Sequence, residues 1–221
     1  MKVRVAGPTV ASPVSLLETA TVTSVSSSRL CSATAADSDG HQEYEVGLSA
    51  KRTEIDFEKE NPEVTTFAGS SQGSTDATGT SAKFANPNGV TTDGTNLYVV
   101  DQTNHKIRKI VISTGVVTTL AGASSGYADS TDGTGLSASF KEPAGITTDG
   151  TNLYVSDYAN HRIRKIVIST GVVTTLAGSG SASFADGTGT SASFYSPMGI
   201  TTDGTNLYVA DFRNHRIRKI E

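Results

Sequence analysis

Three histidines occupy matching positions along the chain, and imidazole rings are common ligands for zinc. His105, His161 and His215 each follow an asparagine and precede a Lys/Arg-Ile-Arg-Lys-Ile segment. Zinc ligands must converge on one point, whereas equivalent positions in successive repeats lie one repeat apart. They converge only if all three face a shared central axis. The spacing therefore favours a structural role for the histidines, and we expect no bound metal.

Carboxylates and amides recur in the same periodic way. Asp101 follows an apolar strand-like run, Asn104 comes three residues later, and Asp76 precedes a Thr-Gly pair. Oxygen atoms of this kind bind Ca²⁺, but an aspartate in a turn also accepts backbone N–H groups. Turn capping is the simpler explanation for Asp101 and its counterparts. The candidate ligand-binding residues are Asp76, Asp132, Asp186, Asp101, Asp157, Asp211, Asn104, Asn160 and Asn214.

No catalytic motif accompanies these residues. The sequence has no Gly-x-Ser-x-Gly nucleophile elbow and no phosphate-binding glycine-rich loop that leads into a helix. Its single cysteine, Cys31, can form no disulfide within the chain and fits an inert thiol better than a nucleophile. We expect neither a catalytic residue nor a cofactor.

Composition excludes several classes of protein. A hydrophobic share of 36% with 18% charged residues argues against a highly charged disordered chain, and one cysteine argues against a disulfide-stapled mini-domain. No apolar run reaches the roughly 18 residues that span a bilayer. Pro8 and Pro13 interrupt the stretch where a signal peptide needs continuous apolar residues. We therefore expect no membrane partner.

The charge balance argues against nucleic acid as a partner. The chain has 18 Lys and Arg against 22 Asp and Glu, and its part from Glu63 onward has 12 basic against 13 acidic residues. Successive strand positions send the cations to opposite sides of a sheet, with their charged heads extending past the core. The tyrosines Tyr98, Tyr154 and Tyr208 lie in apolar runs rather than among the cations. RNA binding is the lesser alternative.

Three copies of one segment recur along the chain and must position these residues. The copies are Asn86–Gly122, Glu142–Gly178 and Ser196–Glu221, spaced by 56 and then 54 residues. Four runs in the first copy have the composition of short strands: Val90–Thr92, Leu97–Val100, Ile107–Ile112 and Val116–Leu120. Tight-turn residues separate them and no helical period intervenes. The pattern predicts an all-β fold built from four-stranded propeller blades.

The repeat resembles the NHL family, named for an Asn-His-Leu signature. The resemblance covers residues 63–221 and rests on Pro-x-Gly, Asn-Leu-Tyr-Val-x-Asp, Asn-His-x-Ile-Arg-Lys-Ile and Val-Thr-Thr-Leu-Ala-Gly in successive strands. It implies a β-propeller, usually of six blades, in which the Asn-His pair supports the turn before the third strand. Related lyase and lactonase propellers hold metals, and some NHL propellers bind RNA. Members with this repeat style resemble exported bacterial proteins, which implies an extracellular or periplasmic location.

The number of strands suggests how such a ring closes. Blades are expected at about residues 84–122, 140–178 and 194–221, and the third ends after its third strand. Val64–Gly69 matches Val117–Gly122 and is therefore a spare fourth strand. Two chains joined head to tail would form one six-bladed ring, each last blade completed by strand 64–69 of the other chain. We predict a homodimer of propeller segments 63–221, with residues 1–62 as an extension of unknown structure.

Two other closures stay open. Residues 1–62 contain strand-like runs that could add one degenerate blade to a four-bladed ring, although they carry no copy of the repeat. The chain could also be part of a longer repeat array. The strand-like runs are Lys2–Val5, Thr19–Val25, Glu43–Leu48 and Thr53–Phe57.

Binding is expected on the face that carries the long loops. Ser70–Lys83, Ala123–Ser139 and Ser179–Ser193 lead into the first strands, and they leave each blade on the same side as the loops after the second strands. The sequence favours a non-catalytic binding or interaction module, for a protein or a small-molecule or glycan ligand, that self-assembles through its open seam. A metal-dependent lyase or lactonase with a site in the central channel is the alternative.

Overall fold

The computed structural model describes residues 32–36, 43–47, 62–123 and 129–221. It divides into two compact units, Met1–Val64 and Thr65–Glu221, close to the boundary expected after residue 62. In the first unit β1 (Ser32–Ala36) pairs antiparallel with β2 (Glu43–Gly47). Strand β2 coincides with one expected run, whereas β1 had no sequence signal. The remaining expected runs, Lys2–Val5, Thr19–Val25 and Thr53–Phe57, lie outside the described residues.

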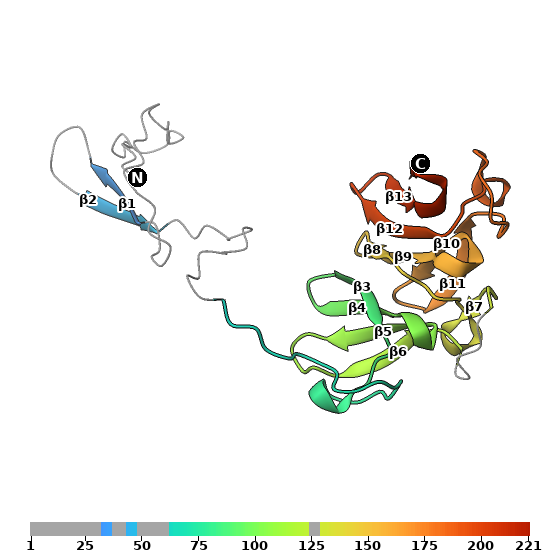
Figure 1. Ribbon diagram of the computed structural model, residues 1–221. Coiled ribbons are helices and arrows are strands. Elements are labelled where there is room, and N and C mark those ends of the chain that lie inside the picture. The colour runs from blue at the N-terminus through green and yellow to red at the C-terminus, as the bar shows by residue number, and fades with distance from the viewer. Residues whose placement is uncertain (1–31, 37–42, 48–61, 124–128) are drawn as a thin grey trace. The chain divides into compact units, whose positions relative to one another are not determined.

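The second unit contains three antiparallel sheets, one for each sequence copy (Figure 1). The first sheet is β3 (Pro87–Thr92), β4 (Asn96–Asp101), β5 (Lys106–Val111) and β6 (Val117–Ala121), in that order. The second is β8 (Ile146–Thr148), β9 (Asn152–Asp157), β10 (Arg162–Val167) and β11 (Val172–Ala177), with the short β7 (Gly133–Thr134) beyond β11. The third is β12 (Pro197–Thr202), β13 (Leu207–Asp211) and β14 (Arg216–Ile220).

Short 3₁₀ turns are the only helices among the described residues, so the expected all-β class is confirmed. Three of them lie in the long loops that enter each sheet, at Gly79–Ser81, Gly135–Ser137 and Gly189–Ser191. Three more follow the second strands, at Gln102–Asn104, Tyr158–Asn160 and Phe212–Asn214. No described helix has the length and apolar character needed to cross a membrane.

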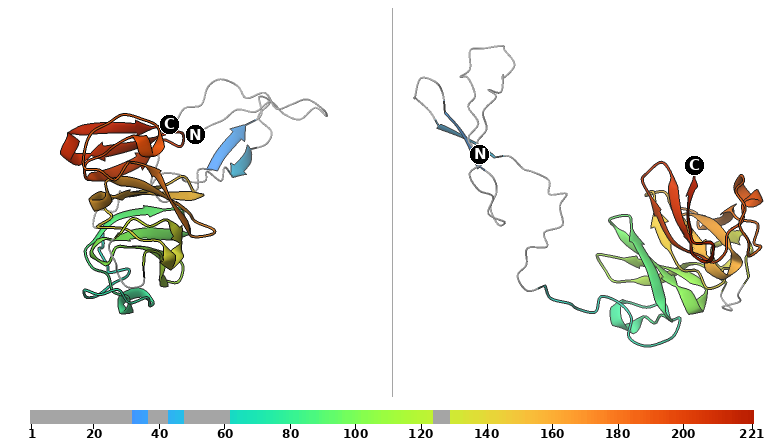
Figure 2. Two further views of the ribbon diagram at one scale, coloured as in Figure 1. Left: turned by 90° about the vertical axis from the view of Figure 1, so that its right-hand side faces the viewer. Right: turned by 45° about the horizontal axis from the view of Figure 1, so that its top comes forward.

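The three sheets follow one another side by side, and the first strand of each lies next to the first strand of its neighbour (Figure 2). Strand β8 contacts both β3 and β12. The backbones approach so closely there that a Cβ on Gly89 would lie 2.6 Å from the carbonyl oxygen of Ala144. Glycine at this position is therefore required by the contact between sheets.

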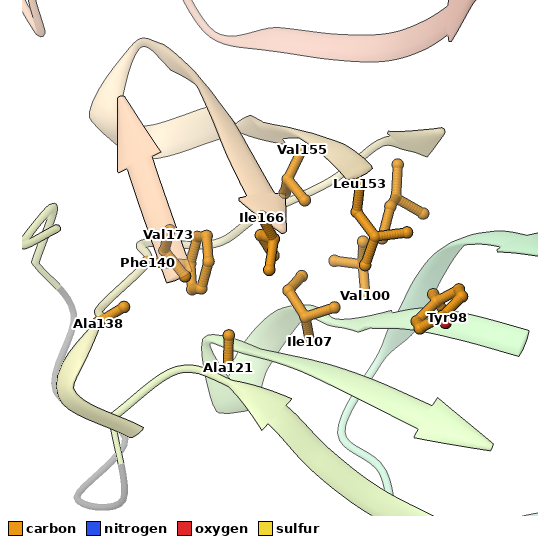
Figure 3. Close-up of a cluster of buried hydrophobic side chains, with 11 residues drawn as sticks. Tyr98, Val100, Ile107, Ala121, Ala138, Phe140, Leu153, Val155, Ile166 and Val173 are labelled. Atoms are coloured by element: carbon orange, nitrogen blue, oxygen red, sulfur yellow. The ribbon is translucent and has the colours of Figure 1, made fainter. Parts of the chain in front are cut away.

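Apolar side chains fill the space between the first two sheets (Figure 3). Val100 and Ile107 of the first sheet pack with Leu153, Val155 and Ile166 of the second, and all are buried. Burying one such side chain contributes about 1.5–3 kcal/mol. Every second residue of each strand faces a neighbouring sheet, so contact between the sheets supplies most of the core.

The segment expected to be a spare fourth strand is not in a strand in the single chain. Within the described residues Val64–Gly69 pairs with no strand, and Val64 is 94% exposed. The N–H of Gly69 donates to the carbonyl of Gly79 at 3.1 Å, as the N–H of Gly122 donates to Gly135 at 3.2 Å. Val64–Gly69 thus leads into the long loop in the same way as β6 leads into the next one, but it pairs with no described sheet of the single chain.

Candidate functional site

A buried arginine joins two aspartates in each sheet. Arg108, on β5, has no exposed side-chain surface. Its guanidinium donates to Asp101 at 2.7 Å and to Asp76 at 2.5 Å, and it lies 5.0 Å from the ring centroid of Phe84. The equivalent pairs are Arg164 with Asp157 (2.9 Å) and Asp132 (2.7 Å), and Arg218 with Asp211 (2.9 Å) and Asp186 (2.8 Å). The nine-residue candidate set is therefore organised around three arginines.

The inner aspartate of each group connects two loops. Asp101 accepts hydrogen bonds from the backbone N–H of Ala85 at 2.7 Å and from the side-chain amide of Asn104 at 2.8 Å, besides Arg108. Asn104 also donates to the carbonyl of Gly73 in the long loop at 2.6 Å. Asn160 and Asn214 make the equivalent bonds, to Asp129 and Ser183. The loops after the second strands thus lie on the same side as the long loops, as expected.

Burial and hydrogen bonding have opposite effects on the pKa of Asp157, the inner aspartate of the second sheet. Burial raises the pKa of the Asp157 carboxyl, while the Asn160 amide, the N–H of Lys141 and the charge of Arg164 oppose that rise. Each oxygen of Asp157 has a donor within 2.9 Å. A buried carboxylate is stable only when it is paired and hydrogen-bonded in this way.

The outer aspartate of each group attaches the long loop to the fourth strand. Asp76 accepts from both the N–H and the hydroxyl of Thr119, at 2.9 and 3.1 Å. Asp132 does the same with Thr175. Within the described residues Asp186 has no such threonine, because the third sheet ends at β14. The side chain of Asp186 is accordingly 82% exposed, against 44% for Asp76 and 50% for Asp132.

This arrangement narrows the predicted ligand site. Asp101, Asp157 and Asp211 have no exposed surface and cannot contact a ligand from solvent. The ligand-binding role of Asp76, Asp132, Asp186 and of the three asparagines stays a prediction, since all six reach the loop surface in part. The turn-capping interpretation of the inner aspartates agrees with their contacts, but it omitted the arginine.

The histidines connect neighbouring sheets. Nδ1 of His105 accepts the backbone N–H of Glu142 at 3.0 Å, and Nδ1 of His161 accepts that of Ser196 at 3.1 Å. Each bond crosses from one sheet to the segment that leads into the first strand of the next. Burial lowers the pKa of His161, and the nearby charges of Lys141 and Arg213 lower it further. In the part of the chain that the structure describes, no group of three His, Cys, Asp or Glu side chains could hold a metal ion.

The opposite edge of each sheet carries the tight turns. Asp93 accepts the N–H groups of Thr95 and Asn96 at 2.8 and 2.7 Å, and the hydroxyl of Tyr98 donates to it at 2.7 Å. These hydrogen bonds hold the pKa of Asp93 below its usual range despite burial. Asp149 and Asp203 make the same turns. This edge is built from nearly identical residues in all three copies.

The copies differ mainly along the opposite rim, which the sequence analysis did not single out. Five aligned positions differ there in every copy: Ala85, Lys141 and Tyr195; Asn86, Glu142 and Ser196; Asn88, Ala144 and Met198; Gln102, Tyr158 and Phe212; Thr103, Ala159 and Arg213. Backbone bonds join the two segments that carry them, for example from the N–H of Thr103 to Ala85 and from that of Arg213 to Tyr195, both at 3.1 Å. We call these positions the variable rim.

The third copy gives the variable rim an aromatic and cationic end. Arg213 lies 5.5 Å from the ring centroid of Tyr195, which contacts the ring of His161 edge-on at 5.6 Å. Hydrogen bonding with the Tyr158 side chain raises the pKa of Arg213, and Tyr195 raises it further. Phe212, which precedes Arg213 in the chain, is exposed. An aromatic cluster with one fixed cation suits a ligand that has both flat apolar and polar groups.

Comparisons with known proteins agree with the repeat architecture. NHL repeat-containing protein 2 of Bos taurus is 34% identical over 155 residues, which cover 63% of this chain and 21% of that protein. SUPPRESSOR OF QUENCHING 1 of Arabidopsis thaliana, a chloroplastic protein, is 34% identical over 149 residues, which cover 62% of this chain and 14% of that protein. The chain carries NHL repeats. No protein-family model matches it.

Solved structures show the same propeller fold for the NHL repeats. An auxiliary nutrient binding protein from Bacteroides thetaiotaomicron matches with a TM-score of 0.53 and 26% identity, over 61% of this chain and 36% of that one. Another protein of that organism, described as of unknown function, matches with a TM-score of 0.52 and 32% identity, over 56% of this chain and 32% of that one. The chain thus spans about a third of these structures and about a fifth or less of the curated relatives.

Three arginines of the NHL repeats contribute little or nothing to an exposed basic surface. Arg108 and Arg164 are fully buried, and the side chain of Arg218 is 10% exposed. Their charges are paired with aspartates inside the sheets rather than extended past the core, contrary to the sequence expectation. Among the described residues, no contact of the remaining cations favours RNA binding.

Proposed function

We propose that the chain is a non-catalytic binding and interaction module that binds a ligand on its variable rim and assembles through its open sheet edges. The distribution of differences between the copies carries this proposal. Shared polar residues such as Asp101, Arg108 and His105 are used by contacts within and between the sheets. Residues that differ between copies collect on the long-loop face, where loops on a rigid scaffold provide recognition.

The side chains of the variable rim favour a small molecule or glycan as the ligand. Amides and hydroxyls of the first copy, among them Gln102 and Asn88, provide hydrogen-bond donors and acceptors. The third copy provides Tyr195, Phe212 and Arg213, which offer flat apolar surface and a cation. The similarity to the Bacteroides thetaiotaomicron auxiliary nutrient binding protein supports binding of this kind.

A lyase or lactonase with a metal in a central channel is the competing function. Such a site needs several ligands of different types converging on one ion. The described residues provide equivalent side chains one copy apart, and His105 and His161 are engaged by neighbouring sheets. Nothing in their geometry favours the enzyme over the binding module.

An oligosaccharide array probed with purified protein tests the proposal. We expect binding that the double variant Phe212→Ala, Arg213→Ala weakens about tenfold or more. A tenfold loss of affinity corresponds to about 1.4 kcal/mol of binding free energy. Thr114→Ala with Thr170→Ala is the matched control, because both residues are exposed in the tight turns of the opposite edge. Stoichiometric metal retained through purification, with turnover abolished by chelation, would favour the enzyme instead.

A further inference from the structure

The third sheet has an open edge with the shape of a missing strand. A cavity of about 370 Å³ lies beside β14, lined among others by Asp186, Gly189, Phe194 and Arg218. In the second sheet β11 lies beside β10, with Val173 and Ala177 buried there. An unpaired strand edge with a cavity beside it is a surface on which another strand can pair.

Val64–Gly69 has the sequence that this edge needs. It reads Val-Thr-Thr-Phe-Ala-Gly, against Val-Thr-Thr-Leu-Ala-Gly in Val117–Gly122 and Val173–Gly178. In the second sheet Arg164 pairs with Thr175 and Ile166 pairs with Val173. The same register on β14 places Thr66 of a second copy opposite Arg218 and Val64 opposite Ile220.

The donated strand would complete the hydrogen bonds of Asp186. Thr119 gives Asp76 an N–H and a hydroxyl, and Thr175 gives the same to Asp132. Thr66 is the residue of Val64–Gly69 that aligns with Thr119. A second copy would therefore provide the two donors that Asp186 lacks within the described residues.

The two outermost sheet faces of the chain are also complementary. Ile217 of the third sheet is 75% exposed, whereas its equivalents Ile107 and Ile163 are buried. Val90 of the first sheet is 60% exposed, whereas its equivalent Ile146 is 6% exposed. Between the first and second sheets, the face that carries Ile107 packs on the face that carries Ile146. The Ile217 face would pack in the same way on the Val90 face of another copy.

Backbone groups at the same faces follow this correspondence. A Cβ on Gly145 would lie 2.2 Å from the carbonyl oxygen of Met198, whereas one on Gly199 would have only the Ala210 side chain within 4 Å, at 3.7 Å. Gly199 thus keeps a position that is open here for a neighbouring first strand. Within the described residues Nδ1 of His215 accepts no N–H, and Asn86 of a second copy aligns with its expected donor.

We propose that two copies join head to tail, with Val64–Gly69 of each copy forming the fourth strand on β14 of the other. Four features of the open ends support this pairing: the strand edge, the absence of a described threonine donor to Asp186, the two apolar faces and Gly199. Two copies would contribute six of the repeat sheets. The inference deepens the assembly part of the proposed function and makes no use of the variable rim.

Absolute mass in solution, measured by light scattering after size exclusion, is the first test. We expect twice 22.9 kDa for the full chain. Thr66→Pro should give a single-copy mass, because proline removes the N–H donor from a segment that has no strand pairing in the single chain. Ile217→Asp should do the same by placing a charge on the apolar face. Ile112→Asp is the matched control, since Ile112 is exposed at a tight turn, and its mass should stay doubled.

A cross-link tests the register of the donated strand. Lys165 pairs with Thr174 in the second sheet, so the equivalent pair is Lys219 with Thr65 of the other copy. Thr65→Cys and Lys219→Cys, in one chain with Cys31→Ser, should oxidise to covalent dimers carrying two disulfides. Moving the first cysteine to Val64 should greatly reduce the yield.

Three results would overturn the inference: a single-copy mass for the unmodified chain, an open ladder of masses, or doubled mass in Thr66→Pro. Glycan binding that Phe212→Ala abolishes in a chain of single-copy mass would retain the ligand part of the proposed function while ending this inference. A doubled mass without glycan binding would do the opposite.

Discussion

The second and third sheets have nearly the same sequence but different surroundings. The second has a sheet on either side and a complete set of strands, whereas the third has one neighbour and ends at β14. Both keep the same internal bonds, including those of Arg164 and Arg218 to their inner aspartates. Only the third leaves its outer isoleucine, Ile217, exposed.

This difference separates what one copy determines from what its neighbours add. Hydrogen bonds within a copy form from residues close in sequence and need no adjacent sheet. Burial of the apolar faces requires a neighbour on each side, as in repeat proteins generally. The third sheet is therefore a natural control for measuring the contribution of neighbours to stability.

The largest effect is expected from removing a buried arginine. Arg164→Ala leaves Asp157 buried without its counter-charge, and breaking such a pair costs about 3–5 kcal/mol. Urea denaturation monitored by circular dichroism should show this loss in the free energy of unfolding. In separate copies, obtained with Thr66→Pro, Arg218→Ala should cost less, because Asp186 is mostly exposed there and water reaches that edge. In assembled copies the two losses should be similar.

Lys165→Ala is the control for the arginine variants, since Lys165 lies beside Arg164 on β10 and makes no salt bridge among the described residues. Its expected change is within about 0.5 kcal/mol, as for most surface substitutions. Equal losses for Arg164→Ala and Arg218→Ala would mean that both edges are equally dry. That result would indicate an assembled third sheet.

The isoleucines give the next largest contrast. Ile163→Ala removes a fully buried side chain and should cost about 2–5 kcal/mol of unfolding free energy. Ile217→Ala should change the stability of a single copy by less than about 0.5 kcal/mol, because its side chain is already in water. Urea denaturation in an Ile112→Asp background compares the two isoleucine variants in assembled protein. The same measurement in a Thr66→Pro background compares them in separate copies.

The effect of Ile217→Ala on stability should depend on whether the copies are assembled. If two copies bury this face, the variant should be as costly as Ile163→Ala in the Ile112→Asp background and nearly neutral in the Thr66→Pro background. A small effect in both backgrounds would show that the Ile217 face stays in water.

Much of the fold was predictable because each copy is locally self-consistent. The β-branched runs, the Asp-Gly turns and the recurring Asp-x-x-Asn spacing all indicate the same sheet. Val64–Gly69 was recognisable as a strand sequence because two other copies of it exist. The sequence of one copy does not determine which strand edge Val64–Gly69 pairs with.

The candidate site was predicted less well. Arg108 was expected among exposed cations, because a strand position alone does not show that Asp76, 32 residues earlier in the chain, returns to pair with it. Asp101 was placed among possible ligand contacts because the loop that buries it is distant in the sequence, and its burial could therefore not be predicted. Comparing the copies for differences would have found Tyr195, Phe212 and Arg213, the signal that identifies the variable rim.

Glycine substitutions test the close approach between sheets with a smaller effect. Gly145→Ala places a methyl group against the Met198 carbonyl and should cost about 1–3 kcal/mol, as overpacking does. Gly199→Ala has room in the single copy and should leave its melting temperature nearly unchanged. Thermal melts of the two variants in the Thr66→Pro background measure this, and equal losses there would contradict the open position of Gly199.

The smallest effect is a pH dependence at the junction of the second and third sheets. Burial, followed by Lys141 and Arg213, lowers the pKa of His161, while Asp211 acts in the opposite direction. The unfolded chain then binds a proton more readily, so this histidine stabilises the fold above its unfolded pKa of about 6.5 and loses that contribution as the pH falls below it. Protonation also removes the Nδ1 acceptor for Ser196. His161→Gln should therefore lose less stability than the unmodified chain between pH 7.5 and 5.5, measured by urea denaturation at both values. His215→Gln should leave that difference unchanged in separate copies, and an equal change in both variants would show that the junction has no special role.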